Sequence, residues 1–209
     1  MKNSEVIVGV GTDVGKTIVA AIRTKLNNFT YWKPIQAGTQ PQTDTERIVQ
    51  LLDGNVRVKS EKFQLTTPAS PHLAAEIDGV TIDLSDLALN DAAFEHVIEG
   101  AGGIYVPINS VGTTYVDVLK MWDLPVIVVS MNYLGSINHT LLTLNALKMN
   151  NISVKGVVFV GDENSSTESC IQLHFPNLIF HRINKAVDVN PEFIKNEVER
   201  WKLNESWYI

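Results

Sequence analysis

The 209-residue sequence predicts an α/β fold, with a doubly wound, mostly parallel sheet flanked by helices. Short β-branched runs without alternating polar residues recur along the chain, which is typical of strands covered on both faces. Segments with apolar residues at helical spacing lie between these runs, and strands that alternate with helices favour a parallel sheet. The sequence contains no Pro, Gly or Ser-rich linker, so residues 1–209 are expected to form a single domain.

Five short runs are the expected strands, and four segments between them are the expected helices. The strand runs are "VIVGV", "TYWKP", "HVIEG", "LPVIVVS" and "VKGVVFV", which begin at Val6, Thr30, His96, Leu124 and Val154. The expected helices cover residues 17–26, 43–52, 114–121 and 137–149. Residues 63–89 break this periodicity and are expected to pass over the carboxyl edge of the sheet, where loops often carry substrate contacts.

Composition and charge are those expected of a folded soluble protein. Hydrophobic residues make up 44% and charged residues 19%, and the net charge of -6 gives no reason to expect nucleic acid as a partner. The only cysteine, Cys170, excludes an internal disulfide and a Cys-rich metal site, and it is expected to be inert. The first apolar run is too short for a signal-peptide core, and no later run approaches the roughly 20 residues of a membrane span. We therefore expect a cytoplasmic protein without a membrane partner.

A glycine-rich stretch, "VIVGVGTDVGKTIVAAI", joins the first expected strand to the first expected helix. It ends in Gly15, Lys16 and Thr17, as a phosphate-binding P-loop does. Backbone N–H groups around Gly15 would meet phosphates at the positive end of the helix, Lys16 would neutralise the β and γ oxygens, and Thr17 would ligate Mg²⁺. The sequence therefore predicts a P-loop NTPase-like domain that binds ATP and Mg²⁺. The expected nucleotide contacts in this loop are Gly11, Thr12, Asp13, Val14, Gly15, Lys16 and Thr17.

The spacing of this loop departs from the common pattern by one residue. Val10 stands where the pattern has its first glycine, between Gly9 and Gly11, so the loop counted from Gly9 is a longer variant. A glycine-rich turn that binds nothing is the alternative. The agreement of strand, loop and helix favours phosphate binding.

Five further motifs follow the loop. They are "YWKPIQAG", "DTERI", "ASPHLAAE", "IEGAGGIYVPIN" and "LGSINHTLLT", which begin at Tyr31, Asp44, Ala69, Ile98 and Leu134. In this order behind the P-loop, they resemble the dethiobiotin synthetase family over nearly the whole chain. The agreement of all five makes the resemblance specific, whereas "EGAGG" alone is shared with related amide-forming P-loop enzymes.

The resemblance implies an ATP-dependent cyclo-ligase of biotin biosynthesis. Members of the family take 7,8-diaminononanoate, CO₂ or bicarbonate, and MgATP. They form a carbamate on one amine and phosphorylate it to a carbamic-phosphoric anhydride, and the second amine then expels phosphate as the urea ring closes. The acceptor of the phosphoryl group is therefore expected to be a carbamate.

Three oxygen-bearing residues are the expected metal ligands. Asp44 begins a helix and Glu99 ends a buried strand, so both carboxylates are expected at the carboxyl edge of the sheet beside Thr17. For Asp44 the alternative is a helix N-cap, and for Glu99 a charge that reaches water. Lys33 precedes a proline after a strand, and together with Lys16 it is the expected catalytic residue, since the reaction gathers negative charge. Alone, Lys33 would be read as a solvated surface lysine.

Contacts to the diamine are expected from several segments. By the resemblance, Ser70 and the backbone of Gly102 and Gly103 line the diamine site, with Lys33 and Ala37. Ser136 and Asn138 begin a strong helix whose N–H groups suit a carboxylate, and the resemblance assigns them to the far end of the substrate across a homodimer interface. A helix simply capped by Ser136 is the alternative. His72 and His139 are given no chemical role.

Two positions depart from the family pattern. Ala37 stands where many members have a serine, so a hydroxyl contact to the diamine or carbamate is missing. Val160, followed by Gly161, stands where the family's adenine-reading asparagine usually falls, although a shift of register could bring Asn164 to that role. Val160 and Gly161 are the expected contacts to the base. Because valine cannot pair with adenine, other nucleoside triphosphates are expected to be accepted in addition to ATP.

Other classes of protein use a similar loop and sheet. A partition-type ATPase needs a second lysine at the start of the loop, where this chain has Gly11, Thr12 and Asp13, and it uses basic patches that are missing here. Another amide-forming P-loop synthetase would bring a glutamine-hydrolysing domain with a nucleophilic cysteine. A catalytically inactive nucleotide-binding module would not need Lys33, Asp44 and Glu99.

Overall fold

The computed structural model describes residues 4–89 and 95–203. Seven parallel strands form the main sheet in the order β4-β2-β6-β1-β7-β8-β9, and two short strands, β3 and β5, form a second parallel pair. The strands are β1 (Glu5–Gly9), β2 (Thr30–Trp32), β3 (Ile35–Ala37), β4 (Arg57–Lys59), β5 (Phe63–Leu65), β6 (His96–Gly103), β7 (Val126–Met131), β8 (Val154–Gly161) and β9 (Ile179–Asn184). The helices are α1 (Lys16–Asn27), α2 (Asp44–Leu51), α3 (Pro71–Ile77), the 3₁₀ turn η1 (Leu84–Leu87), α4 (Tyr115–Trp122), α5 (Ser136–Met149), α6 (Ser165–His174) and α7 (Pro191–Lys202).

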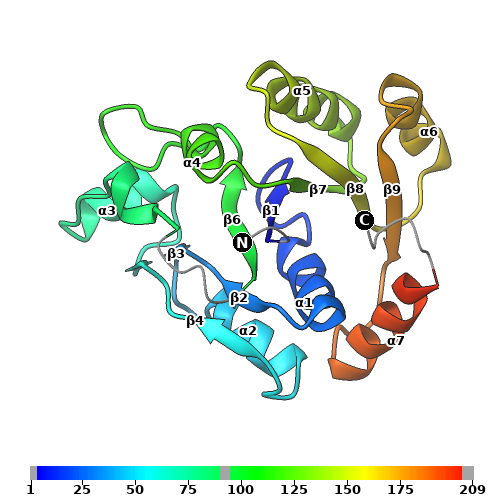
Figure 1. Cartoon of the computed structure of the whole chain (residues 1–209), viewed down its shortest axis with the longest axis horizontal. Helices are drawn as coiled ribbons and strands as arrows, with labels where there is room; N and C mark the ends of the chain where they lie inside the picture. Colours follow the sequence, from blue (N-terminus) through cyan, green and yellow to red (C-terminus); the bar gives the residue numbers. More distant parts are fainter. Residues whose placement is uncertain (1–3, 90–94, 204–209) are drawn as a thin grey trace.

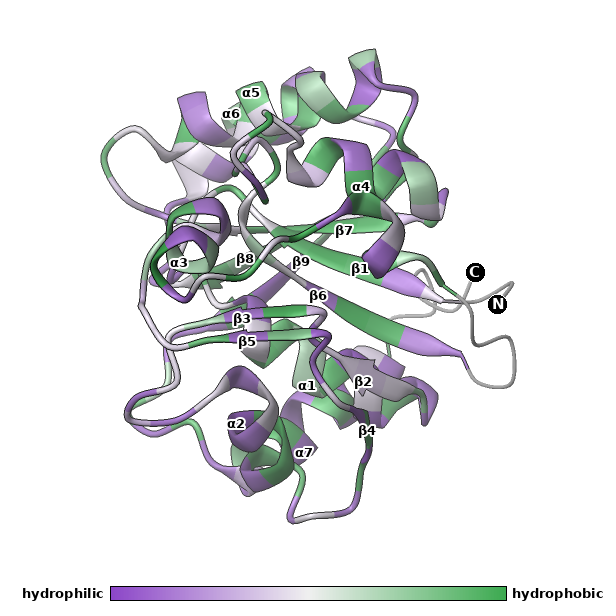
Figure 2. Cartoon of the chain, turned by 90° about the vertical axis from the view of Figure 1, so that its left-hand side faces the viewer, coloured by the Kyte–Doolittle hydropathy of each residue, from purple (hydrophilic) through white to green (hydrophobic). Residues whose placement is uncertain are grey.

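Helices cover both faces of the sheet, as Figures 1 and 2 show. The helices α1, α2 and α7 lie on one face, and α4, α5 and α6 lie on the other. Each face has its own apolar core, one centred on Ile7, Ile22 and Val129 and the other on Val8, Trp32 and Phe159. Alternate residues of the same strand therefore enter opposite cores, which is why the central strands read as continuous apolar runs.

The strand β1 lies where the connectivity of the sheet reverses. It pairs with β6 on one side and with β7 on the other. Outward from β1, one half of the sheet contains β6, β2 and β4, and the other half contains β7, β8 and β9. In doubly wound sheets, ligands bind outside the carboxyl ends of the strands at such a reversal. The loop after β1 therefore lies at the position where this fold binds ligands.

The predicted fold class is confirmed, and the elements missed by the sequence analysis lie at its edges. Residues 63–89 contain β5, α3 and η1, and β5 pairs with β3 just after Lys33. The edge strands β4 and β9 and the helices α3 and α7 were not predicted. Edge strands are half exposed and α3 has only two turns, so neither gives the long apolar pattern of a central element.

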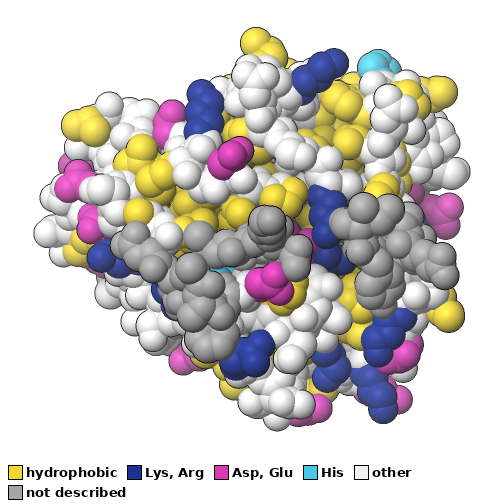
Figure 3. Space-filling view, in the orientation of Figure 1, with side chains coloured by type: hydrophobic (Ala, Val, Ile, Leu, Met, Phe, Trp, Pro, Cys, Tyr) yellow, Lys and Arg dark blue, Asp and Glu magenta, His cyan; other side chains and the backbone are white. Residues whose placement is uncertain are grey.

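None of the described helices is long and apolar enough to cross a membrane. On the face shown in Figure 3, Lys and Arg side chains lie among Asp and Glu side chains and do not form a continuous basic surface.

Candidate active site

The loop between β1 and α1 has the backbone geometry of a phosphate-binding loop. Gly15 has φ of 96°, in the left-handed region, and a Cβ atom there would lie 2.9 Å from the Cγ1 of Val160. A Cβ atom at Gly9 would lie 2.6 Å from the carbonyl oxygen of Gly11. Both glycines are therefore required by close packing, and the loop turns tightly into the N-terminus of α1, where N–H groups can receive an anion.

Lys16 folds back over this loop. Its Nζ donates a hydrogen bond to the carbonyl oxygen of Gly11 at 2.8 Å, and the side chain is largely buried. Burial lowers the pKa of Lys16 and the Lys33 ammonium lowers it further, against the opposing effect of nearby carboxylates. The ammonium is thus held above the loop in an environment that favours an added negative charge, such as a phosphate.

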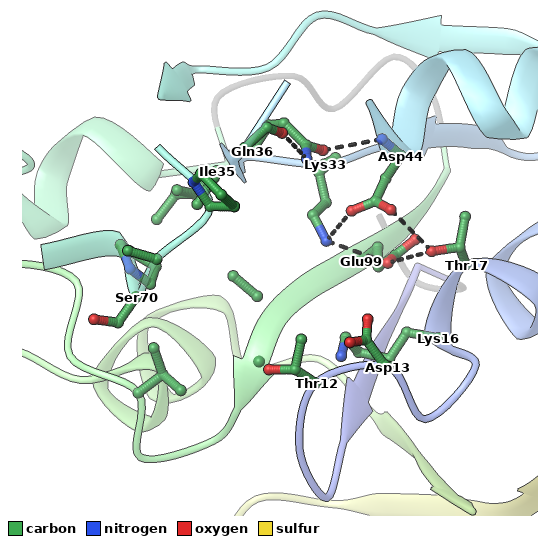
Figure 4. Close-up of a pocket in the computed structure, with 18 of the residues that line it drawn as sticks. Thr12, Asp13, Lys16, Thr17, Lys33, Ile35, Gln36, Asp44, Ser70 and Glu99 are labelled. Atoms are coloured by element: carbon green, nitrogen blue, oxygen red, sulfur yellow. Dashed lines mark hydrogen bonds and ion pairs between the residues drawn. The ribbon is translucent and has the colours of Figure 1, made fainter. Parts of the chain in front are cut away.

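Thr17, Asp44 and Glu99 converge at one point of the site (Figure 4). The Oγ1 of Thr17 lies 3.1 Å from Oδ1 of Asp44 and 2.9 Å from Oε1 of Glu99. These groups come from α1, α2 and β6, so the fold brings together residues that are far apart in the sequence. Thr43 caps α2 through a capping box, which leaves Asp44 as the first helical residue with its carboxylate directed into the site.

Lys33 lies beside the same carboxylates. Its Nζ is 2.7 Å from Oδ2 of Asp44, 3.2 Å from Oε1 of Glu99, and donates to the carbonyl oxygen of Gly100 at 3.1 Å. Burial alone would lower the pKa of Lys33, but the two carboxylates outweigh it and the pKa is raised. Burial would likewise raise the pKa of Asp44, and Lys33 and Thr17 reverse this, so that the pKa is lowered. At neutral pH, Lys33 is therefore charged and Asp44 ionised.

Two residues that hold this arrangement were missed by the sequence analysis. Tyr31 is buried in β2 and donates from its hydroxyl to Oε2 of Glu99 at 2.9 Å. Burial and the Glu99 carboxylate raise the pKa of Tyr31 well above its ordinary value, so the phenol remains a donor. Gln36 accepts from the backbone N–H of Asp44 at 3.1 Å and donates to the carbonyl oxygen of Gly38 at 2.8 Å. The sequence signal for Gln36 was its position in "KPIQAG", just before the loop that leads to α2, where a side-chain amide can hold the loop to the helix.

A cavity of about 820 Å³ joins the P-loop to the second, two-stranded sheet. Of the predicted site residues, those that line it are Thr12, Asp13, Gly15, Lys16, Thr17, Lys33, Ala37, Asp44, Ser70, Glu99 and Gly102. Ile35, Pro71 and Val106 give it an apolar portion beside Ser70. The hydroxyl of Ser70 lies 3.0 Å from Nδ1 of His72, so His72 orients a side chain of the cavity wall.

The remaining predicted site residues lie elsewhere or contribute only backbone. Gly11 and Val14 lie in the P-loop and Gly103 lies beside it, but none of the three lines this cavity. Ser136 and Asn138 lie in the first turn of α5 and do not line it either. The N-cap of α5 is Gly135, with φ of 101°, so the alternative of a helix capped by Ser136 is wrong: Ser136 is already inside the helix and is buried.

Val160 and Gly161 end β8 next to the P-loop. The side chain of Val160 is 8% exposed and packs against Gly15. Asn164 caps α6, since its Oδ1 accepts from the backbone N–H of Thr167 at 3.0 Å. To read adenine, the side chain of Asn164 would therefore have to give up this capping bond.

The donor set fits a hard divalent cation. One hydroxyl and two carboxylates converge, and Mg²⁺ prefers oxygen ligands of this kind. Within the part of the chain that the structure describes, no group of three or more His, Cys, Asp or Glu residues could hold a metal alone. A Mg²⁺ ion at this point would therefore complete its shell with phosphate oxygens and water, as it commonly does beside a P-loop.

The loop after β1 lies at the reversal of strand order, with a buried lysine over it and oxygen donors converging beside it. Together these features define a P-loop nucleotide-binding protein. A family model described as an AAA domain matches residues 4–192. The chain is 45% identical over 167 residues to the ATP-dependent dethiobiotin synthetase BioD of Rhodopseudomonas palustris strain BisB18, which covers 79% of each chain. It is 46% identical over 172 residues to the BioD of Brucella anthropi, covering 82% of this chain and 81% of the relative. The chain therefore belongs to the dethiobiotin synthetase family, which is a family of enzymes.

Solved structures with the same fold come from another functional class. A ParA family ATPase from Chlorobium tepidum TLS aligns with a TM-score of 0.59 and 14% identity, over 99% of this chain and 95% of that chain. A plasmid partition protein from Borrelia burgdorferi B31 aligns with a TM-score of 0.58 and 10% identity, over 100% of this chain and 99% of that chain. At such low identity, these likenesses show the fold alone.

Proposed function

We propose that this protein makes dethiobiotin from 7,8-diaminononanoate, CO₂ and ATP in biotin biosynthesis. The observation that carries the proposal is the continuous cavity from the P-loop to Ser70 and Ala37, with Lys33 between the two ends. A phosphoryl donor at one end and a diamine at the other would meet at Lys33. The family relationship supplies the chemistry for which such a cavity is suited.

The proposed reaction has three steps. One amine of the diamine adds to CO₂ and loses a proton, giving a carbamate. A carbamate oxygen attacks the γ-phosphorus of ATP, and ADP leaves. The second amine then attacks the carbamoyl carbon and phosphate leaves, which closes the urea ring.

The residues of the cavity have distinct roles in this scheme. Lys16 and the N–H groups at the start of α1 bind the triphosphate, and Lys33 offsets the charge of the carbamate. Thr17, Asp44 and Glu99 would hold Mg²⁺, which neutralises the β and γ oxygens when it is bound. Ser70, Ala37 and the backbone of Gly102 border the diamine.

We further propose that the active site is completed by a second copy of the chain. The exposed side of α5 carries the apolar residues Leu142 and Met149, which are 60% and 83% exposed, together with polar residues such as Asn145 and Lys148. Leu134 and Tyr133, which precede the helix, are also exposed. Exposed large apolar side chains favour an interface. A symmetric dimer that uses them would bring the first turn of α5 in one copy, with the backbone of Ser136 and the exposed side chain of Asn138, toward the substrate of the other.

The proposal extends to the chain as a whole. We place residues 1–209 in one domain that works in the cytoplasm, without a nucleic-acid or membrane partner. ATP is the proposed phosphoryl donor, with other triphosphates accepted because of Val160.

A direct assay tests the function. Purified protein is incubated with MgATP, bicarbonate and 7,8-diaminononanoate, and dethiobiotin is measured by mass spectrometry. We expect dethiobiotin, ADP and phosphate in equal amounts, and none of the three without the diamine. Diamine-independent ATP hydrolysis without dethiobiotin would instead support a nucleotide switch of the partition type.

A further inference from the structure

The two carboxylates of the metal site already hold a cation of the protein itself. The ammonium of Lys33 lies 2.7 Å from Asp44 and 3.2 Å from Glu99. Lys33 is only 4% exposed, so water screens this pair of contacts very little. Two carboxylates that face one another in a buried site repel, and an ammonium between them removes much of that repulsion.

We propose that Lys33 is the resident counter-ion of the metal site and that it exchanges with the divalent cation. When the cation enters, the ammonium leaves Asp44 and Glu99 and turns toward the part of the cavity that takes an anion. A metal ion and the ammonium could not keep the same oxygens, because the like charges would lie within a few ångströms in a buried site. Binding of the metal and release of Lys33 are therefore one event.

The hydrogen bonds around Glu99 allow this exchange without loss of its position. Tyr31 holds Oε2 at 2.9 Å, while Lys33 and Thr17 both use Oε1. Departure of Lys33 therefore removes one of the two contacts of Oε1, keeps the contact from Thr17, and leaves the carboxylate anchored through Oε2. The ammonium keeps a second acceptor, the carbonyl oxygen of Gly100, so it need not leave the site.

The exchange predicts that Lys33 has opposite effects on metal binding and on the reaction. Lys33 should weaken binding of a divalent cation in the absence of nucleotide, although the reaction needs its charge. Only the destination of the released ammonium rests on the proposed carboxylation. The exchange itself depends on the metal set alone, so it can be measured without substrate and can fail independently of the dethiobiotin assay.

Mn²⁺ binding to the nucleotide-free protein tests the proposal. Calorimetry and the electron paramagnetic resonance signal of free Mn²⁺ would give its affinity for wild type and for Lys33→Met. We expect Lys33→Met to bind Mn²⁺ at least about tenfold more tightly, because two ionised carboxylates lose their competing cation. Lys33→Arg, which keeps the charge, should bind as weakly as wild type.

Two further variants separate the exchange from a general change of charge. Lys16→Met removes the same charge from the same cavity, but Lys16 donates to a carbonyl oxygen and not to the carboxylates. We expect it to raise Mn²⁺ affinity much less than Lys33→Met. The double variant Lys33→Met with Glu99→Gln should lose the gain. Equal Mn²⁺ affinity in wild type and Lys33→Met would overturn the proposal, as would equal gains in the two lysine variants.

Thermal unfolding guards against a variant that folds poorly. If Lys33→Met is destabilised by its uncompensated carboxylates, Mn²⁺ should raise its Tm more than it raises that of wild type. Lys33→Gln, which keeps hydrogen-bond donors without the charge, should respond in the same direction. A Tm response to Mn²⁺ no greater than that of wild type in both variants contradicts the exchange, and so does failure of Mn²⁺ to fold either of them.

Discussion

Lys16 and Lys33 lie in one cavity but have different partners. Lys16 donates to the carbonyl oxygen of Gly11, whereas Lys33 is paired with two carboxylates. An incoming triphosphate would therefore meet Lys16 without first separating it from an anion. We therefore predict that Lys16, of the two lysines, stabilises the charge that develops on the transferred phosphoryl group.

Replacement of Lys16 tests this assignment. Lys16→Ala should lower kcat for dethiobiotin formation by about 10²-fold or more, the usual cost of losing one preorganised contact to transition-state charge. Lys25→Ala is a matched control, because Lys25 lies in the last turn of the same helix and is exposed. Steady-state kinetics at saturating MgATP would measure both variants. Turnover of Lys16→Ala close to that of the control would remove Lys16 from the chemistry.

At the scale of single residues, the sequence predicted groups that carry charge better than groups that position them. Lys16, Thr17, Lys33, Asp44 and Glu99 were all expected, and the structure brings them together. Tyr31 and Gln36 were missed, because a tyrosine in an apolar strand run is interpreted as core and a lone glutamine as a surface residue. Their roles follow only from which atoms they face once the sheet has formed.

The end of β8 illustrates how an element decides what a side chain can read. Val160 lies in the last part of the strand, where its side chain packs against the left-handed Gly15 of the P-loop. The loop that follows is held by Glu168 of α6, which accepts from the amide of Asn132 at 2.7 Å and from the backbone N–H of Asn164 at 3.1 Å. The loop is thus built by bonds within the protein, and the apolar residue Val160 stands at the position expected from the family resemblance to read the base.

We predict that this element makes the enzyme tolerant of the base. An asparagine that pairs with two atoms of a base edge contributes about 1–3 kcal/mol of discrimination, by analogy with the reading of bases in DNA, and valine contributes none of this. We expect kcat/KM for CTP, GTP and UTP within about tenfold of that for ATP. Measurement of the four values decides the matter. A preference for ATP of about a thousandfold would show that another group reads adenine.

A second prediction concerns the packing of β9 on α7. The ring centroid of His181 in β9 lies 4.3 Å from that of Trp201 in α7. The charged groups around this pair are Glu197 and Arg200 on α7, Arg182 in β9 and Arg23 on α1. Burial, together with the charges of Arg200 and Arg23, lowers the pKa of His181 to about 4. As the pH falls, His181 therefore binds a proton at about pH 6.5 in the unfolded chain but only at about pH 4 in the folded protein.

This difference should reduce the free energy of unfolding as the pH falls from about 6.5 to about 4. We expect the contribution of His181 to be about 1 kcal/mol, because the side chain is only partly buried and solvent screens it. His181→Phe keeps a ring against Trp201 and cannot bind a proton. Urea titrations at several pH values should therefore show a shallower acid loss for the variant, and equal slopes for the two proteins would contradict the prediction.

Elements were predicted from sequence where apolar residues form a continuous strand run or recur at helical spacing. The central strands and α1, α2, α4 and α5 were expected within a few residues of their observed bounds. The pair β3 and β5 has three residues in each strand, and these strands form because the chain after Lys33 pairs with a segment nearly thirty residues later. Such pairing depends on tertiary contacts that local propensity does not encode.

For the whole molecule, the position of each site relative to the sheet follows from topology. The P-loop and Glu99 lie together because β1 and β6 are neighbours at the reversal of strand order. The first turn of α5 follows β7, on the other side of β1, and its residues do not line the cavity of their own chain. A residue from α5 could therefore complete the site more readily from a second copy.

Mixed dimers test whether two chains share each active site. Asn138→Ala should raise KM for the diamine while leaving ATP binding unchanged, and Lys16→Ala should abolish turnover. In a mixed dimer, one site carries both defects, but the other combines an intact Lys16 from one chain with an intact Asn138 from its partner. With random exchange, half of the dimers are mixed and each has one intact site, so we expect about a quarter of wild-type activity at low diamine concentration. Exchange is confirmed by native mass spectrometry of differently tagged chains. If exchanged mixtures are no more active than the average of the two homodimers, each chain carries its whole site and the exposed face of α5 has another purpose.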